Sequence, residues 1–372
     1  MSLLAFLIAI FILVGFHEFG HFITAKWCGI TVERFSIGFG PVLWRKKPVR
    51  ANDTEFVLSL IPLGGYVKML DNRNGDFLSE EQKLRAFNHQ VLWKRSLVVL
   101  AGPLANFLLA WVLLAVLFLS SPIQVRPILS APGINSMAAE LGIVEGDEVR
   151  GFLELDSTMT EQIIQTESIQ SWNRLRWKLL KTVFTKNGFV LELDHEGKGL
   201  YRVQFTSSQI QNINFQGDLF GQLGLIPSKT DVDLLFNLDV DIPTAFYLAT
   251  ERVFDISYVS LMSIKSLITG DASIKQITGP IGIAGMAGKS AQSGIVAYFG
   301  FLSLISISLG LMNLLPLPML DGGQLVFDAW ELVTGSPISE AFRALAVKVG
   351  LMGIILVTCI AFYNDFLKIF SG

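Results

Sequence analysis

Four long runs of apolar residues divide the chain. They lie at about residues 2–26, 97–120, 294–315 and 344–363, and charged residues are sparse inside each of them. An α-helix needs about 20 apolar residues to cross roughly 30 Å of hydrocarbon. The pattern therefore predicts an α-helical polytopic membrane protein with about four transmembrane helices.

The composition agrees with that prediction. The chain has 372 residues, of which 51% are hydrophobic and 16% are charged, and its mean hydropathy is +0.51. These values are typical of a membrane protein and exclude an ordinary soluble domain. The net charge of −3 gives no sign of nucleic-acid binding. Cys28 and Cys359 lie far apart, so we expect two small buried residues and no disulfide framework.

The first apolar run differs from a cleaved signal peptide. It has no basic segment before it and no small-x-small cleavage site, and its second half carries two histidines and a glutamate. A cleaved leader normally shows the first two features and lacks the third. We therefore expect a transmembrane helix that is retained in the mature protein.

Residues 29–69 follow a different pattern, because β-branched and aromatic residues are interrupted by Gly and Pro. The pattern predicts a membrane-associated β-hairpin region, with strands near residues 32–37, 54–59 and 65–69. Two roles are open for this region. An exposed edge can bind an extended peptide by strand addition, or the hairpins can be a structural element packed on the helices.

Residues 122–225 have the composition of a soluble domain. Pro-Gly, Ala-Ala, Gly and Gly-Asp elements at residues 132–147 precede an amphipathic stretch at 168–184 and β-rich stretches at 189–194 and 201–206. This order resembles a PDZ domain, an inserted α+β fold that binds peptide ends by strand addition. The alternative is a packing module that only occludes a site. One helical face of the amphipathic stretch holds Trp172, Leu175, Leu179 and Val183.

The segment that follows mixes apolar stretches with charged side chains. Glu251, Arg252, Asp255 and Lys265 interrupt its apolar part. The mixture argues against a further transmembrane helix and predicts an amphipathic segment at the membrane interface. The chain is thus expected to contain an N-terminal membrane half, a PDZ-like domain, this interfacial segment and a C-terminal membrane half, at residues 1–121, 122–225, 226–292 and 293–372.

Basic residues gather before the second apolar run. Residues 26–95 contain twelve Lys and Arg against seven Asp and Glu, and four of the basic residues form a cluster at residues 45–50. By the positive-inside rule this loop is cytoplasmic. Residues 122–225 carry more acidic than basic residues, and we expect them on the extracytoplasmic side.

The first apolar run contains the pentapeptide His17-Glu18-Phe19-Gly20-His21. Two residues four apart on a helix differ by about 400° of rotation, so both imidazoles point within about 40° of each other. Two imidazoles on one face can hold a zinc ion, and Glu18 is placed to polarise a water beside it. Ionisable groups at membrane depth are costly and usually functional. The alternative is a chance match on a buried helix.

A second candidate motif ends the third apolar run. Pro316 and Pro318 break the helix there and place Asp321 on irregular backbone at membrane depth. Such backbone is tolerated only where it is buried in protein or lines a cavity. A carboxylate at this point is suited to be a third zinc ligand, which leaves the fourth position for water. Without a metal, Asp321 would cap the next helix.

Asn106 is the one strongly polar side chain inside the second apolar run. A buried amide needs a partner, and two are open to it: a hydrogen bond to another helix, or a place in the site. Spacing alone favours the interhelical hydrogen bond.

Four motifs together resemble the site-2 protease family. They are H-E-F-G-H in the first apolar run, P-L-G-G-Y-V after residue 61, G-P-x-x-N in the second run and N-x-x-P-x-P-x-L-D-G-G in the third. The resemblance covers nearly the whole chain, and the layout looks like the bacterial branch that regulates sigma-E. It implies a zinc-dependent intramembrane metalloprotease in which His17, His21 and Asp321 bind Zn2+ and Glu18 is the catalytic base.

The same resemblance implies partners and a location. The substrates would be single-span membrane proteins, such as anti-sigma factors trimmed by an earlier protease and remnant signal peptides, cut in regulated intramembrane proteolysis. The protein would be a multi-pass protein of the bacterial cytoplasmic (inner) membrane. Better-known members carry two tandem PDZ domains, whereas this sequence shows one convincing segment. Positions that match the family near the site or on its β-loop are Asn106, Asn313, Pro316, Pro318, Gly64, Gly65 and Tyr66.

Two other classes of protein fit parts of the pattern. A zinc transporter usually shows internal repeats and charged residues in several spans, and this sequence displays neither. A non-catalytic PDZ scaffold has no need for Glu18, because binding zinc does not require that glutamate. The protease interpretation therefore explains more of the sequence.

The charge asymmetry predicts how the chain is oriented in the membrane. A cysteine at position Ser157 should react with a membrane-impermeant thiol reagent in intact cells, and one at Ser79 should react only after the membrane is opened. Both variants are made in a chain whose Cys28 and Cys359 are replaced by serine. Labelling of Ser79→Cys alone in intact cells would reverse the orientation.

Overall fold

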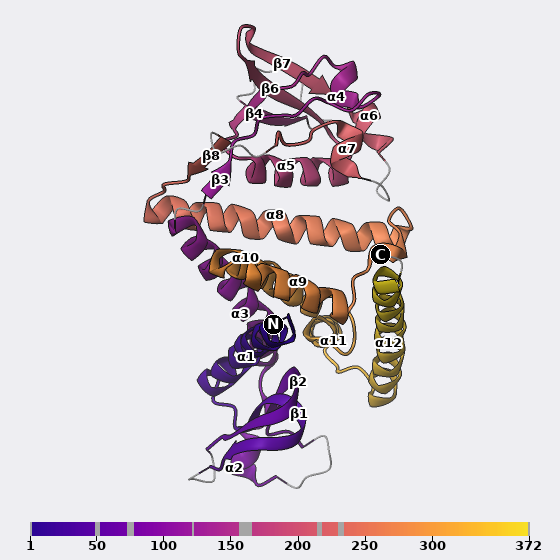
Figure 1. Cartoon of the computed structure of the whole chain (residues 1–372). Helices are drawn as coiled ribbons and strands as arrows, with labels where there is room; N and C mark the ends of the chain where they lie inside the picture. Colours follow the sequence, from indigo (N-terminus) through magenta and orange to yellow (C-terminus); the bar gives the residue numbers. More distant parts are fainter. Residues whose placement is uncertain are drawn as a thin grey trace. The chain divides into compact units, whose positions relative to one another are not determined.

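Figure 1 shows the computed structural model of the chain, in which helices predominate and three small sheets are present among the described residues. Arg50 of the basic cluster and the labelling position Ser157 lie outside those residues. The structure describes residues 2–48, 53–72, 78–120, 123–155, 166–213, 218–229 and 234–370, apart from the side chains of residues 62 and 63.

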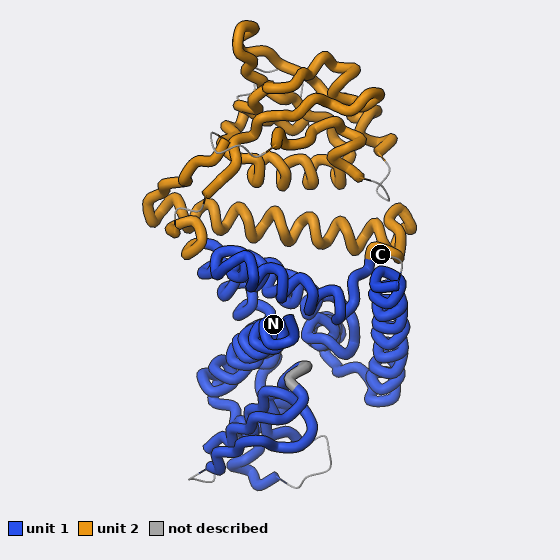
Figure 2. Tube along the Cα trace, in the orientation of Figure 1, with its two compact units in different colours: residues 1–114, 277–372 blue, residues 115–276 orange. Residues whose placement is uncertain are grey.

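The chain divides into two compact units (Figure 2). The first contains residues 1–114 and 277–372, and the second contains residues 115–276. The first unit holds most of the long apolar helices and both candidate metal-binding motifs.

Four helices are long and apolar enough to cross a membrane, which agrees with the predicted number of spans. They contain between 20 and 31 residues, with mean hydropathies of 2.1 to 2.4. These helices are α1 (Ser2–Trp27), α3 (Leu92–Leu119), α10 (Ile295–Leu314) and α12 (Glu340–Phe370). Two shorter helices of the first unit are α9 (Pro280–Gln292) and α11 (Asp321–Thr334).

One side of α1 is suited to close packing. Ala5, Ala9 and Leu13 recur every four residues and are buried, as one face of a helix requires. The same buried stripe continues to His17 and His21, so packing turns both histidines toward the inside of the unit. The core around the first part of the stripe also contains Leu109, Ala287, Phe301 and Leu302.

The β region folds as two long strands, β1 (Val32–Lys46) and β2 (Glu55–Met69). The expected strands near residues 32–37, 54–59 and 65–69 correspond to paired segments, although the second and third are joined in β2 without a break. β1 turns at Gly38 and Gly40, whose φ angles of 90° and 83° favour glycine. β2 also reverses, because its residues 55–58 pair in parallel with residues 34–37 and its residues 65–68 pair antiparallel with the same residues. Residues 34–37 of β1 pair with both halves of β2, so they lie between those halves.

Aromatic side chains anchor the β region to the end of α1. The ring of Phe22 lies 5.5 Å from that of Phe35 and 5.7 Å from that of Phe56, measured between centroids. The short helices α2 (Glu80–Lys83) and η1 (Phe87–His89) then lead from β2 to α3. The core at this end of α1 also contains Ala25, Cys28, Ile30 and Val32.

The two cysteines differ in their surroundings. Cys28 is buried, as expected, whereas Cys359 is exposed on α12. The expectation that both are buried is wrong for Cys359, because α12 is exposed around its whole circumference at residues 355–359. Both cysteines are free thiols, which agrees with the expected lack of a disulfide framework.

The second unit is built on a four-stranded antiparallel sheet in the order β5-β4-β6-β7. Helix α5 (Trp172–Thr185) packs on this sheet and buries Leu175, Leu179 and Val183 in its core (Figure 1). The predicted helix and the two predicted strands are confirmed, while the PDZ-like identity stays a prediction. The strands are β4 (Glu148–Leu155), β5 (Glu167–Ser168), β6 (Gly188–His195) and β7 (Gly199–Phe205).

A small two-stranded sheet closes this part of the chain. β3 (Ile123–Val125) pairs antiparallel with β8 (Leu235–Asn237), so the chain enters and leaves the four-stranded sheet at one place. The remaining short helices of the second unit are α4 (Met137–Glu140), α6 (Ser207–Gln211), α7 (Leu219–Leu223) and η3 (Ile274–Gln276).

Helix α8 (Ile242–Thr269) is amphipathic. Its Glu251 forms ion pairs with Arg174 at 3.2 Å and Lys178 at 2.9 Å, both on α5. Large apolar side chains recur on another face at intervals of seven residues and are exposed. The helix is therefore polar toward α5 and carries an apolar stripe on another face. The exposed apolar side chains are Tyr247, Phe254, Leu261 and Ile268.

Candidate metal centre

The first two candidate ligands lie one turn apart on the buried stripe of α1. His17 and His21 are each 9% exposed, and Glu18 is 8% exposed. The two imidazole rings meet edge to face, with centroids 4.8 Å apart. The helical spacing predicted the shared face, and the packing of α1 explains why that face points inward.

Asp321 reaches the histidines from another helix. Helix α10 ends at Leu314, a turn follows, and Asp321 is the first residue of α11. The expected irregular backbone therefore precedes Asp321, and the residue itself is helical. The N-cap of α11 is Leu320, so the alternative in which Asp321 serves as a cap does not apply.

The two glycines after Asp321 let α11 begin tightly against the preceding turn. A Cβ atom on Gly322 would collide with the carbonyl oxygen of Leu315, and one on Gly323 would collide with that of Leu317. A larger residue at either position would push the start of α11 away, and Asp321 with it. The helix restarts at Asp321 because these glycines permit the close approach.

Three atoms converge at the centre of the site. Nε2 of His17 lies 3.2 Å from Nε2 of His21, and Oδ2 of Asp321 lies 3.2 Å from the first and 3.4 Å from the second. A tetrahedral zinc ion with bonds of about 2.0–2.1 Å spaces its ligand atoms about 3.3–3.4 Å apart. Oδ2 of Asp321 is buried and has no hydrogen-bond partner among the described residues. The donor set and its spacing therefore fit Zn2+.

A backbone carbonyl orients the second histidine. Nδ1 of His21 lies 2.8 Å from the carbonyl oxygen of Val98 on α3. A carbonyl can only accept, so His21 donates from Nδ1 and its Nε2 is left bare. This is the usual way in which a protein prepares an imidazole to bind a metal.

Asn106 supports the first histidine. Its side chain is fully buried, and its amide lies 3.2 Å from Nδ1 of His17, while Oδ1 has no partner in the described part of the chain. With the amide turned by 180°, Nδ1 of His17 donates to Oδ1 and Nε2 of His17 is left bare for a metal. Asn106 therefore contacts His17 on another helix, and because His17 is a candidate ligand, the same contact places Asn106 at the site. The two interpretations of Asn106, an interhelical hydrogen bond and a place in the site, describe this one contact.

Two glycines bring neighbouring elements against the site. A Cβ atom on Gly102 of α3 would collide with Nε2 of His21. A Cβ atom on Gly65 of β2 would lie 2.7 Å from Cγ of Glu18. Gly102 therefore keeps the space beside the ligand atom open, and Gly65 sets the end of the β region against the candidate base.

Other predicted positions have neighbours of their own. Tyr66 stacks on Phe39, with ring centroids 6.1 Å apart, and Pro318 lies against Gly350 of α12. Asn313 is half-buried near the end of α10. Within the described residues, no hydrogen bond or ion pair joins the three candidate ligands to Tyr66, Asn313, Pro316 or Pro318.

Sequence reasoning missed two supports of the site. Val98 acts through its backbone carbonyl, and a backbone contact leaves no mark in the residue type. Gly102 belongs to the G-P-x-x-N motif, and a glycine in an otherwise bulky apolar run is the signal from which a close approach could have been inferred.

Two imidazoles, a carboxylate and a neighbouring glutamate, buried among helices that can cross a membrane, define an integral-membrane metallopeptidase. The sequence profile of peptidase family M50 matches residues 5–357. The chain therefore belongs to peptidase family M50 and is an enzyme of the site-2 protease type.

Relatives match along almost their full length. The regulator of sigma E protease of Haemophilus influenzae is 32% identical over 443 positions, which cover 99% of each chain. The protease RseP of Yersinia pestis is 31% identical over 450 positions, again 99% of each chain. A Vibrio cholerae protein, whose name assigns it provisionally to the zinc metalloproteases, is 31% identical over 449 positions and 99% of each chain. The 443 positions of the first comparison exceed the 372 residues of this chain by 71.

Asp321→Ala should lower the zinc content of the purified protein much more than Asn106→Ala does. The first change removes a ligand, whereas the second removes a partner of a ligand and should weaken zinc binding by roughly 10- to 100-fold. Metal analysis of the detergent-purified variants measures this, with Asn313→Ala as a control that should keep its zinc. Equal zinc content in the Asp321 and Asn106 variants would remove Asp321 from the coordination shell.

Proposed function

We propose that this protein is a zinc-dependent intramembrane endopeptidase that hydrolyses peptide bonds within or near the transmembrane segments of single-span membrane proteins. The observation that carries the proposal is the convergence of His17, His21 and Asp321 within 3.4 Å, beside the buried Glu18. In the part of the chain that the structure describes, no other group of three such side chains could hold a metal ion.

In this proposal the two histidines and Asp321 hold the ion, and Glu18 is the general base. When bound, zinc supplies a Lewis acid that polarises a carbonyl group and makes water nucleophilic near neutral pH. Glu18 follows His17 directly in the helix, so its carboxylate lies beside the ligands without being one of them. It accepts a proton from the attacking water and returns it to the nitrogen of the leaving peptide.

The β region supplies a place for the substrate backbone. Residues 65–69 of β2 pair with β1 on one side, and among the described residues no strand pairs with their other side. A helical substrate must be unwound before cleavage, because its carbonyl groups are already hydrogen-bonded within the helix. Strand addition at this edge holds the peptide extended. The contact between Gly65 and Glu18 supports this role, because it brings the edge to the base.

We assign the enzyme to the bacterial cytoplasmic (inner) membrane. The names of relatives from Haemophilus influenzae and Salmonella typhimurium connect them with the regulation of sigma E. This connection supports anti-sigma factors, trimmed by an earlier protease, as one class of substrate. Remnant signal peptides are a second class, because they too consist of a single apolar segment. The charge asymmetry supports a cytoplasmic loop at residues 45–50 and an extracytoplasmic PDZ-like domain.

A zinc transporter and a non-catalytic scaffold explain less of the molecule. A transporter is expected to repeat its charged positions in several spans, whereas the metal-binding groups described here form one cluster. A scaffold protein does not need the buried carboxyl group of Glu18, and burying such a group lowers the stability of the fold.

Glu18→Gln should abolish cleavage and leave zinc bound. Glutamine has nearly the same size but cannot accept the proton, so turnover should fall by at least about 100-fold. Cleavage of a panel of tagged single-span proteins is measured beside the zinc content of the purified enzyme. Glu140→Gln, an exposed position on α4, is the control and should cleave at the wild-type rate. A Glu18→Gln enzyme that cleaves near the wild-type rate would contradict the mechanism.

We also propose that the sheet domain of the second unit limits access of substrates and takes no part in the chemistry. Its one histidine, His195, lies 2.9 Å from the fully buried Asp147 and belongs to no metal cluster of the described residues. Because β3 and β8 are paired, residues 126–234 can be replaced by a short Gly/Ser turn. This deletion removes the whole hydrophobic core of the sheet domain, including the buried Ile210 and Leu223.

The deletion variant should still bind zinc and cut a substrate that is already trimmed to a short stub. Its cleavage of untrimmed substrate should rise above that of the full chain, because the outer domain of the substrate meets no obstacle. The same deletion carrying Glu18→Gln controls for contaminating proteases. Loss of all cleavage by a folded, zinc-loaded deletion variant would make the domain a required receptor.

A further inference from the structure

One face of α11 carries four polar side chains in a row. Asp321, Gln324, Asp328 and Glu331 recur at intervals of three or four residues, which is the spacing of one helical face. Asp321 lies at the candidate metal centre, and the other three lie one to three turns further along the helix. A polar stripe among apolar helices requires partners.

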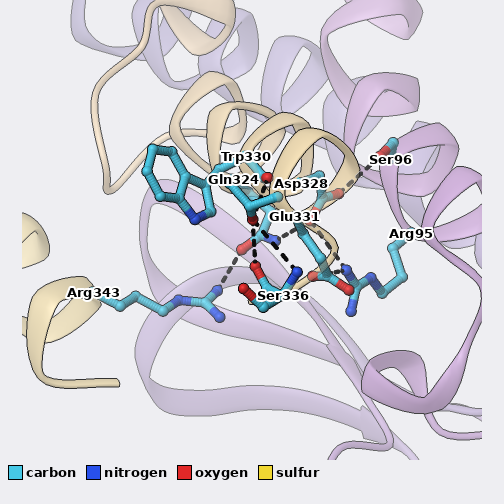
Figure 3. Close-up of polar contacts among 9 residues, drawn as sticks. Arg95, Ser96, Gln324, Asp328, Trp330, Glu331, Ser336 and Arg343 are labelled. Atoms are coloured by element: carbon cyan, nitrogen blue, oxygen red, sulfur yellow. Dashed lines mark hydrogen bonds and ion pairs between the residues drawn. The ribbon is translucent and has the colours of Figure 1, made fainter. Parts of the chain in front are cut away.

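The first turn of α3 supplies those partners (Figure 3). Oγ of Ser96 donates a hydrogen bond of 2.9 Å to Oδ2 of Asp328, and Nε2 of Gln324 donates one of 2.8 Å to Oδ1 of the same carboxylate. Nη2 of Arg95 lies 2.5 Å from Oε2 of Glu331 and 3.6 Å from Oδ1 of Asp328. We name Arg95, Ser96, Asp328 and Glu331 together the α3–α11 clamp.

The clamp is largely shielded from solvent. Asp328 is 3% exposed, and the side chain of Arg95 is 14% exposed. Charge-assisted hydrogen bonds in such surroundings are short and directional, and removing one partner leaves the other charge uncompensated. Arg343 extends the cluster, because it donates to Gln324 and lies 5.5 Å from the ring centroid of Phe327. Two arginines therefore face two carboxylates, and the formal charges balance.

The clamp gives α11 a second attachment, away from the metal centre. On α11, Asp328 follows Asp321 by seven residues, which span about 10.5 Å of helix. On α3, the residues that contact the two histidines follow Arg95 by three, seven and eleven residues, and they are Val98, Gly102 and Asn106. The metal centre and the clamp therefore hold α11 at two separate points, and the second contact prevents α11 from sliding along α3 or turning about Asp321.

The metal centre needs such a constraint. Without a cation, the bare Nε2 atoms of His17 and His21 and the carboxylate of Asp321 present lone pairs to one another at short distance. We propose that the α3–α11 clamp is a positioning device, which fixes α11 along α3 and holds Asp321 within reach of both histidines before a metal binds. The inference rests on the proposed metal centre and goes beyond it, because the clamp acts on zinc affinity from a distance of about two helical turns.

Asp328→Asn tests the clamp. Asparagine keeps the size of the side chain. It removes the negative charge of Asp328, which accepts a hydrogen bond from Ser96 and lies close to Arg95. The zinc dissociation constant of the full-length, detergent-purified protein, measured by competition with a chromophoric chelator, should rise about tenfold. At saturating zinc, kcat should return to the wild-type value. A damaged fold would not be rescued by excess zinc, so this split separates positioning from general destabilisation.

Asp365 on α12 provides a matched control. It is 2% exposed and accepts hydrogen bonds of 2.9 Å from the backbone N–H groups of Gly279 and Gly282. It is therefore also a buried carboxylate that joins two segments, and among the described contacts it has none with the metal centre. Asp365→Asn should leave the zinc dissociation constant unchanged, even where it lowers the melting temperature.

Three results would decide whether the clamp positions Asp321 for zinc binding. Equal zinc affinity of the wild type and Asp328→Asn would overturn the clamp and leave the metal centre standing. A wild-type protein that binds no zinc would overturn the metal centre and the clamp together. Should Asp328→Asn fail to fold, Ser96→Ala decides, because it removes one hydrogen bond and keeps every charge. That variant should weaken zinc binding about threefold, and an unchanged affinity would overturn the clamp.

Discussion

The site depends on one electrostatic constraint, which is that three atoms with free lone pairs meet inside a bundle of apolar helices. Such a cluster is unfavourable in low-dielectric surroundings unless a cation joins it or a rigid frame enforces it. The small residues of α1 let its buried stripe pack closely within the bundle, so both histidine side chains point into the bundle. Helix α3 then orients both imidazoles, one through the carbonyl of Val98 and one through the amide of Asn106. The remaining candidate ligand, Asp321, is held by the start of α11, which the two following glycines allow to approach.

The part of this site that follows from helical periodicity could be predicted from the sequence. His17 and His21 share a face because they are four residues apart, and ionisable residues in an apolar run are rare enough to be noticed. Asp321 was found through its motif, since no local rule brings a residue so far along the chain to that face. Where α11 begins could not be read from the two prolines, because it depends on how closely the glycines pack on α10. The role of Val98 lies in its backbone and is invisible in the residue type.

In the β region and the second unit, too, features that depend on long-range packing could not be predicted from the sequence. Pro and Gly at residues 62–65 mark the turn between the two halves of β2, but the pairing of residues 42–46 with residues 56–59 could not be predicted, because it depends on contacts beyond the local sequence. Burial of Cys359 was expected from its residue type, whereas α12 is exposed on all sides around this residue. The described part of the second unit contains one four-stranded sheet, and at least 71 positions of the alignment with the Haemophilus influenzae relative have no counterpart in this chain.

Zinc K-edge X-ray absorption of the purified, full-length protein tests the central claim most directly. The account predicts a first shell of nitrogen and oxygen atoms at about 2.0–2.1 Å, with the outer-shell scattering of two imidazole rings. The signal should be the same in detergent and in lipid, because the ligands are buried within one unit. A shell that contains sulfur at about 2.3 Å, or the scattering of a single imidazole, would contradict the account.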